Sequence, residues 1–394
     1  MRVLVTNAHR NVGFLVTRHL AAAGHDVVAA DSRALPLGLR SRHARAFELL
    51  PDPLADGYAE CLLDLVRRTW PDVLMPLGGL AAVTARRADF ERECAVLAAD
   101  GAAYQALLDK ASVYALCGRF GIPHPRVLGT DPQEVCARFP EPATGSPLAA
   151  IKPRRDQGAG RGLAFIENPE QLAALWPGLE QRYGPLVCTD YVPGAVDAQH
   201  ALHLLFDRDS ELIEFFVLRK LRQWPRRSGI TVAATSSHEL GLIERVLPLF
   251  KHLRWSGPVE VELKRDERDG QDRVLEINPR FSGTLPFCLA AGVDMLQSML
   301  NASRGRCGPR ALRPYYAAGL YYWNPWPFAR SVLRDLASVD GFRQGLRDLA
   351  LPFARRPVGN PYRLSDPAAL AGKLLLQVAE ACERRWPAAG RGAP

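Results

Sequence analysis

Residues 258–280 read PVEVELKRDERDGQDRVLEINPR, and the fold of the central region follows from this stretch. Two segments of alternating polarity flank Asp269-Gly270, a dipeptide that strongly favours a tight turn between antiparallel strands. Side chains alternate along each strand, so a hairpin about that turn brings two pairs together on one face. The predicted pairs are Glu262 opposite Glu276 and Glu260 opposite Asn278.

Opposed carboxylates predict a bound cation. Like charges directly across an antiparallel pair repel each other, and Mg²⁺ relieves this by taking carboxylate and phosphate oxygens as ligands. The predicted ligands of Mg²⁺, or of Mn²⁺, are Glu262, Glu276 and Asn278, and Arg280 follows at the strand end. The alternative is an exposed amphipathic hairpin with scattered acidic residues.

A second motif joins a lysine to a glycine-rich loop. The apolar run 149–153 contains Lys152, and a loop follows with three glycines in five positions. Glycine lets backbone N–H groups approach phosphate oxygens, and lysine supplies a compact positive charge. The loop lacks the Gly-Lys-Ser/Thr of a Walker motif, and 163–166 predicts a strand where a dinucleotide motif has a helix. We expect either a flap over a nucleotide or a basic surface turn, formed by Gly158, Ala159, Gly160, Arg161 and Gly162.

Over residues 1–300 the chain resembles the ATP-grasp superfamily. The matching segments, in the order of that family, are a lysine before a helix (107–112), a strand lysine with a glycine flap (149–162), a hinge (187–194) and the metal-binding end (262–280). The resemblance implies adenine at the hinge, beside Asp190, Tyr191 and Val192. Thr189 stands where the family has a glutamate, so the implied adenine contacts are backbone ones.

The same resemblance implies an activity and roles for charged residues. A stand-alone ligase of this kind uses ATP and Mg²⁺ to join a small carboxylate to an amine through an acyl phosphate, releasing ADP and phosphate. Arg280 and Lys152 are the implied catalytic residues. The implied nucleotide contacts are Lys110 and Lys152 on phosphates, Asp197 on the ribose hydroxyls and Lys220 beside the phosphates.

Two neighbouring segments allow two interpretations each. Residues 220–231 are predicted to form a basic loop, which lies either beside the phosphates or free on the surface. In one interpretation residues 281–284 face the acceptor substrate. In the other, the side chain of Ser282 or of Thr284 caps a helix.

The first hundred residues predict a parallel α/β unit. Strands are expected at 2–6, 25–30 and 73–76, with helices at 13–23 and 58–69. The first strand-to-helix turn has one glycine where an NAD fingerprint needs three, which argues against NAD binding. His9 and Arg10 in that turn lie either toward a substrate cleft or in a solvated loop.

The predicted fold class is therefore α/β and α+β. A Rossmann-like domain (1–108) precedes an ATP-grasp domain (109–300) and a basic, aromatic C-terminal extension (301–394). Within the second domain we expect a flap lobe (121–190) and a metal-binding lobe (191–300). A helix at 110–120 and strands at 200–206 and 211–220 belong to it.

Composition is consistent with an enzyme that has sizeable cores. The 394 residues are 47% hydrophobic and contain no run of 18 to 20 apolar residues. The segment after Arg2 predicts a strand and not a signal peptide. Eight cysteines without Cys-x-x-Cys spacing argue against a zinc site or disulfide framework, and favour a reducing compartment and a cytoplasmic location.

The charge of the chain is concentrated near its end. Residues 301–394 hold 14 arginines and one lysine against six acidic residues, whereas the whole chain carries +8. With the aromatic residues of 315–326, this extension could bind single-stranded nucleic acid, an anionic membrane surface or an anionic substrate. We favour aromatics that pack a strand onto the core under surface arginines, with a helix at 366–385. The rival to a ligase is a nucleotide-binding regulatory or nucleic-acid-binding protein that uses this extension.

Overall fold

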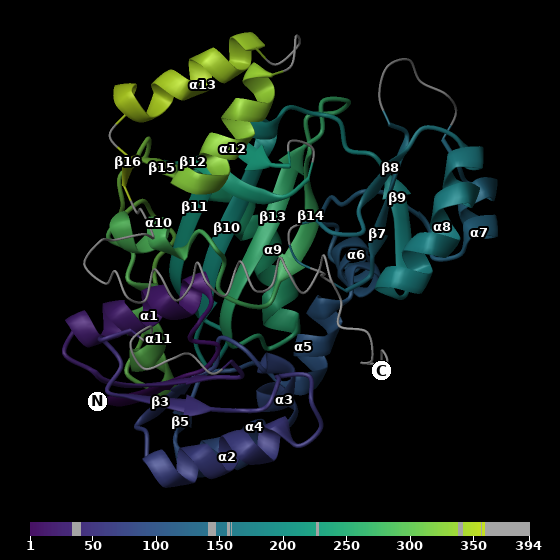
Figure 1. The fold of residues 1–394 in the computed structure, drawn as a ribbon. Coiled ribbons are helices and arrows are strands. Elements are labelled where there is room, and N and C mark those ends of the chain that lie inside the picture. The colour runs from purple at the N-terminus through teal and green to yellow at the C-terminus, as the bar shows by residue number, and fades with distance from the viewer. Residues whose placement is uncertain are drawn as a thin grey trace, which may run out of the picture. The chain divides into compact units, whose positions relative to one another are not determined.

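The structure is a computed structural model that describes residues 1–33, 41–140, 147–155, 158, 160–225, 228–337, 342–355 and 357–358 (Figure 1). The described part of the chain forms two compact units, one within Met1–Val96 and the other within Leu97–Asn360. The predicted helix at 366–385 lies outside the described residues. Among those residues, no helix is long and apolar enough to cross a membrane.

The described part of the first unit is a five-stranded parallel sheet, which confirms the Rossmann-like prediction. Its strand order is β3-β2-β1-β4-β5. The elements are β1 (Arg2–Val5), α1 (Asn11–Ala22), β2 (Asp26–Asp31), β3 (Ala46–Leu49), α2 (Tyr58–Thr69), β4 (Val73–Met75), α3 (Leu80–Ala85), α4 (Arg87–Glu93) and β5 (Ala95–Val96).

The turn after β1 differs from both interpretations of His9. His9 is buried, its backbone N–H donates to Asp31 Oδ2 over 2.8 Å, and its ring contacts the same carboxylate. The single glycine of this turn has a packing role, because a Cβ at Gly13 would lie 2.3 Å from the carbonyl oxygen of Asn7. The turn is therefore held against the end of β2 by the contacts of His9 with Asp31.

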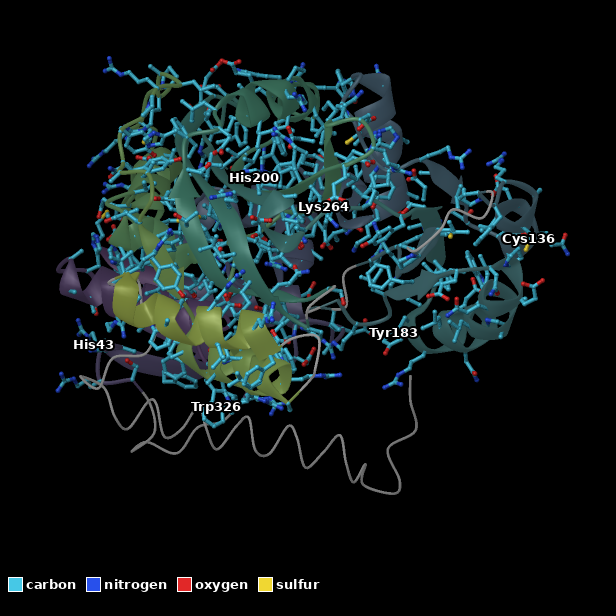
Figure 2. The ribbon with its side chains drawn as sticks, turned by 90° about the horizontal axis from the view of Figure 1, so that it is seen from above. His43, Cys136, Tyr183, His200, Lys264 and Trp326 are labelled. Atoms are coloured by element: carbon cyan, nitrogen blue, oxygen red, sulfur yellow. The ribbon has the colours of Figure 1, made fainter. Side chains whose placement is uncertain are left out.

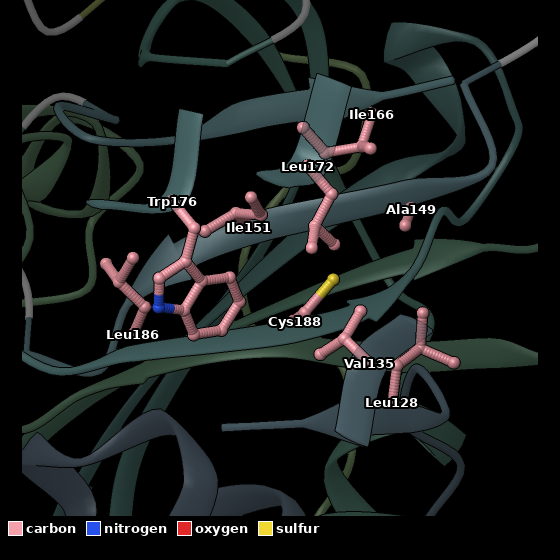
Figure 3. Close-up of a cluster of buried hydrophobic side chains, with 9 residues drawn as sticks. All are labelled: Leu128, Val135, Ala149, Ile151, Ile166, Leu172, Trp176, Leu186 and Cys188. Carbon is pink, nitrogen blue, oxygen red and sulfur yellow. The ribbon is translucent and has the colours of Figure 1, made fainter. Parts of the chain in front are cut away.

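The second unit contains a small antiparallel sheet with strand order β6-β9-β7-β8. Helices α7 (Pro132–Ala137) and α8 (Pro169–Tyr183) cover one face, where Trp176 and Leu172 pack with apolar residues of every strand of this sheet (Figures 1 and 3). The strands are β6 (Val127–Gly129), β7 (Ala149–Pro153), β8 (Ala164–Ile166) and β9 (Leu186–Asp190). Helices α5 (Gly101–Leu108) and α6 (Lys110–Arg119) precede them.

A larger, mainly antiparallel sheet forms the rest of this unit, in the order β14-β13-β10-β11-β12-β15-β16. Its elements are η2 (Val196–Ala198), β10 (Gln199–Phe206), β11 (Leu212–Trp224), β12 (Ile230–Ser237), α9 (Gly241–His252), β13 (Gly257–Arg265), β14 (Asp272–Asn278), α10 (Leu285–Ala290) and α11 (Met295–Ser303). The C-terminal extension adds β15 (Tyr321–Trp323), α12 (Pro325–Leu336), α13 (Phe342–Ala354) and β16 (Pro357–Val358).

The prediction of a loop over 220–231 was wrong at both ends. Strand β11 continues to Trp224, and β12 resumes at Ile230. Leu221 and Trp224 pack against a cluster that includes Tyr321 and Phe328, so burial of their side chains extends the strand. The aromatic segment packs a strand onto the sheet as predicted, because Tyr321 and Tyr322 of β15 are buried against β12.

Candidate nucleotide and metal site

The hairpin of β13 and β14 has the predicted register. Glu260 pairs with Asn278, and Glu262 pairs with Glu276. The register shifts directly after Glu262, so that Leu263 faces Val274. The two glutamates are thus opposed on one face of the sheet.

Each opposed carboxylate contacts a lysine from another element. Lys110 Nζ, at the start of α6, lies 2.7 Å from Glu276 Oε1. Lys220 Nζ, on β11, lies 2.7 Å from Glu262 Oε2 and is almost fully buried. The carboxylates themselves keep 25% and 24% of their side-chain surface exposed. The cluster therefore has two charges of each sign, and both carboxylates remain accessible from solvent.

These residues fit a magnesium ion that also has phosphate ligands. Across the described part of the chain, no three His, Cys, Asp or Glu residues gather as a metal cluster. Two glutamates and the amide oxygen of Asn278 are oxygen donors of the kind that Mg²⁺ takes, and Mg²⁺ typically completes its coordination with phosphate oxygens and water.

Lys152 of β7 lies next to this cluster. Its Nζ donates to Tyr114 Oη over 2.9 Å, and the Tyr114 hydroxyl donates to the Leu275 carbonyl oxygen over 2.8 Å. Burial, followed by the neighbouring positive charge of Lys110, lowers the pKa of Lys152 to about 8. An anion that approached this lysine would therefore raise its pKa and favour the charged ammonium form.

Asp109 joins the helix of Lys110 to the strand of Lys152. Its carboxylate accepts from the Ala111 backbone N–H over 2.9 Å and so caps α6. The same carboxylate accepts two hydrogen bonds from Arg154, over 3.1 and 2.5 Å. The backbone N–H of Lys110 also donates to the Arg154 carbonyl oxygen over 2.8 Å. The bonds of Asp109 and of the Lys110 backbone N–H to Arg154 thus connect the start of the Lys110 helix to the end of the Lys152 strand.

A buried polar network lies behind Asn278. Glu260 accepts from Asn278 Nδ2 over 3.3 Å and from Ser282 Oγ over 2.5 Å. Ser282 contacts Thr284, whose hydroxyl lies 3.0 Å from His203 Nε2. Burial lowers the pKa of His203 to about 3, so the ring is neutral.

This network orients the amide of Asn278. Since the Nδ2 group donates to Glu260, the Oδ1 atom is left to accept from Arg280 Nη2 over 3.3 Å. The Thr284 side chain makes no capping bond to the helix that follows, so that alternative for 281–284 was wrong for Thr284.

The hinge segment is fixed by β13 and by the hairpin turn. Lys264, which is labelled in Figure 2, donates from Nζ to the Val192 carbonyl oxygen over 2.9 Å. Arg268 Nη2 contacts Asp190 Oδ2 over 3.0 Å. The Tyr191 ring packs edge-on against Phe165 of β8. Thr189 is fully buried between β6 and β7.

The glycine loop has the backbone that only glycine adopts easily. Gly158, Gly160 and Gly162 have φ of 74°, 69° and 78°. Arg161 Nε donates to the Gly158 carbonyl oxygen over 3.2 Å. Ala159 lies outside the described residues. Asp197, in η2, is exposed to solvent.

Most of the charged residues predicted for the site lie together. The structure brings together Lys110, Lys152, Lys220, Glu262 and Glu276, with Asn278 and Arg280 at one end. Sequence reasoning missed Tyr114 and Lys264, although both had a signal. Tyr114 lies four residues after Lys110 on the same helix, and Lys264 lies two after Glu262 on the same strand, so each shares a face with a predicted residue.

Comparison with known proteins gives a consistent result. Residues 211–320 match a family model described as "ATP-grasp in the biosynthetic pathway with Ter operon". A D-aspartate ligase of Enterococcus faecium (strain Aus0004) is 22% identical over 210 residues, which are 50% of this chain and 49% of that protein. The match thus spans about half the length of this curated relative.

Solved structures share the fold at low identity. The biotin carboxylase domain of the Hydrogenobacter thermophilus 2-oxoglutarate carboxylase, in complex with MgADP, ADP and bicarbonate, is 18% identical with a TM-score of 0.62; 81% of this chain and 73% of that one are covered. The N5-carboxyaminoimidazole synthetase of Staphylococcus aureus is 15% identical with a TM-score of 0.62, and the shares are 87% and 86%.

Proposed function

We propose, on the premise that this chain has the ATP-grasp fold, that it is an ATP- and Mg²⁺-dependent ligase that joins a carboxylate to an amine. The observation that carries the proposal is the cluster of two opposed glutamates and three lysines described above. Phosphoryl transfer requires positioning and charge neutralisation more than a protein nucleophile, and this cluster would supply both.

In this proposal the carboxylates hold the metal and the lysines hold phosphates. Glu262, Glu276 and Asn278 would be the protein ligands of Mg²⁺, which neutralises charge on the phosphates when bound. Lys110 and Lys220 each contact a glutamate over 2.7 Å, so a metal ion on the glutamates would free both ammonium groups for phosphate oxygens. Lys152 would contact the same phosphates, because its Nζ lies near enough to Lys110 and Glu276 for their charges to act on its pKa.

The reaction would proceed in two steps, formation of an acyl phosphate and its attack by the amine. An oxygen of the substrate carboxylate attacks the γ-phosphorus of ATP, forming an acyl phosphate as the bond to ADP breaks. The amine then attacks the acyl carbon, phosphate leaves, and the amine loses a proton. We assign Arg280 to the transferring phosphoryl group, because its guanidinium bonds to Asn278 beside the proposed metal ligands.

The remaining nucleotide contacts are assigned by position. Backbone groups of Asp190, Tyr191 and Val192 would contact adenine, and the N–H groups of the glycine loop 158–162 would cover the phosphates. The side chain of Asp197 would accept from the ribose hydroxyls. The metal-binding site would be equally suited to Mn²⁺.

The test is a turnover assay with panels of carboxylates and amines, following ADP and phosphate, with mass spectrometry of the product. We expect ADP release only when a matching carboxylate and amine are both present, with a product mass equal to their sum less one water. A salt-dependent affinity for nucleic acid without any turnover would instead support the regulatory or nucleic-acid-binding alternative.

A further inference from the structure

The C-terminal helices α12 and α13 have one side buried on Arg222 of β11. The Arg222 guanidinium contacts Asp335 of α12 and Asp348 of α13, and it also donates to the hydroxyl and carbonyl oxygens of Ser331. Asp335, Asp348 and Arg222 are all buried. The acidic residues of the described part of these helices are therefore bound inside the protein.

On the opposite side of the same helices, the exposed charged side chains are all cations and the exposed large uncharged side chains are all apolar. Exposed fractions are 70% for Trp326, 65% for Leu333, 48% for Phe342 and 49% for Leu346. Exposed arginines lie between them along both helices, at Arg330, Arg334, Arg343 and Arg347. We call these eight residues the basic apolar face. Within the described residues of 325–355, it has no exposed carboxylate to balance it.

We infer that the basic apolar face docks on an anionic lipid surface. Interfacial helices of this kind place Trp, Phe and Leu at the boundary of the acyl chains while arginines contact lipid phosphates. Each arginine near an anionic surface adds an attraction of about a factor of five in affinity. The inference does not depend on the ligase activity.

The composition of the face distinguishes lipid from other partners. A nucleic acid would pair with the arginines and stack on Trp326 or Phe342, but it would leave the aliphatic Leu333 and Leu346 in water. A second copy of the same face would place arginine against arginine, which repels. An anionic lipid surface takes up both the charge and the aliphatic groups.

The experiment is vesicle sedimentation of the full-length protein. We expect binding to vesicles of equimolar phosphatidylglycerol and phosphatidylcholine, weak binding to phosphatidylcholine alone, and a decrease as salt is raised. Absence of binding to the anionic vesicles at low salt would overturn the inference.

Variants then locate the binding surface. Replacing Arg330, Arg343 and Arg347 with Gln should weaken partitioning about a hundredfold. The matched control replaces the exposed Arg138, Arg182 and Arg306 with Gln, which removes the same charge elsewhere in the same unit. For the apolar part, Leu333→Ser is compared with Leu54→Ser, since Leu54 is 93% exposed. Equal losses in test and control variants would mean that binding is unspecific, and the inference would be wrong.

A measurement on the unmodified protein avoids the risk that a variant misfolds. Amide hydrogen exchange in α12 and α13 should slow when anionic vesicles are added, whereas exchange in α8 should not change. Protection by a single-stranded oligonucleotide, with none from vesicles, would assign the face to nucleic acid and overturn the inference.

Discussion

Glu276 combines two interactions at one carboxylate, since it contacts Lys110 and faces Glu262 across the hairpin. Replacing Glu276 with Gln should reduce turnover by about two orders of magnitude or more, because the amide has no charge to hold Mg²⁺. The free energy of unfolding should change by less than about 1 kcal/mol, since the lost ion pair is partly exposed. The measurements are turnover against Mg²⁺ concentration and urea unfolding.

The control for this variant is Glu267→Gln, which removes an exposed carboxylate from the turn of the same hairpin. It should keep wild-type turnover. A Glu276→Gln protein that reached the wild-type rate at limiting Mg²⁺ would show that the metal assignment is wrong.

Lys152 gives a pH dependence with a definite sign. Its pKa is lowered from 10.5 to about 8. Phosphate oxygens would raise it again, so ATP binding should take up a proton between about pH 8 and pH 10.5 and almost none below pH 7. Calorimetry at pH 9 in two buffers of different ionisation enthalpy measures this uptake.

The matched variant is Lys152→Arg, because a guanidinium keeps its charge throughout this range. Its binding enthalpy should not depend on the buffer. Proton uptake that persists in Lys152→Arg would assign the effect to another group.

Replacing Glu260 tests whether its hydrogen bond orients the side-chain amide of Asn278. In Glu260→Gln the side chain can accept from only one of Asn278 and Ser282, and its own NH₂ faces the other donor. We expect a loss of about 1–3 kcal/mol in the free energy of unfolding. The Mg²⁺ concentration for half-maximal turnover should also rise, because Asn278 Oδ1 is no longer held.

Ser282→Ala is the control, since it removes one donor and leaves Asn278 bonded to Glu260. It should destabilise the protein and leave the Mg²⁺ requirement unchanged. If both variants shifted the Mg²⁺ requirement equally, Glu260 would have a structural role only.

At the level of elements, the strand–loop–strand unit of β7, residues 154–163 and β8 should respond to nucleotide. Backbone N–H groups of Gly158, Gly160 and Gly162 should be exchange-protected with ATP and Mg²⁺ and unprotected without them, because phosphate oxygens would accept their hydrogen bonds. Hydrogen exchange measured across 155–165 checks this, with α9 as a segment that should not change. Identical exchange in both conditions would count against a phosphate flap.

Some elements could be predicted because their pattern is local. The register of β13 and β14 follows from alternation and from the turn at Asp269-Gly270, and the pairing of Glu262 with Glu276 was correct. Lys110 begins its helix because Asp109 caps it, which is also a local signal.

Other features depend on contacts far apart in the sequence. The end of β11 was predicted as a loop because Lys220 and Arg222 are charged, yet both are buried by partners 42 to 126 residues away. No local pattern identifies those partners. The bond from Lys264 to the hinge carbonyl of Val192 is of the same kind, since it spans 72 residues.

At the level of the whole chain, Arg222 connects the strand of Lys220 to both C-terminal helices. Arg222→Met would remove the buried guanidinium that contacts Asp335 and Asp348, which should cost about 3–5 kcal/mol in the free energy of unfolding. Urea unfolding measures the loss. A rescue variant that adds Asp335→Asn and Asp348→Asn should recover much of it, because the buried charges are then gone. If the rescue variant were no more stable than Arg222→Met, the buried carboxylates would not be the cause.

The bonds of Asp109 have a mechanical consequence. Because this one carboxylate caps the helix of Lys110 and pairs with Arg154 at the end of the strand of Lys152, it links the two lysines to each other. The same helix is also bonded to β14, through Lys110 on Glu276 and through Tyr114 on the Leu275 carbonyl oxygen. A movement that separated the small sheet from the β13–β14 hairpin would therefore have to break one of these two sets of bonds.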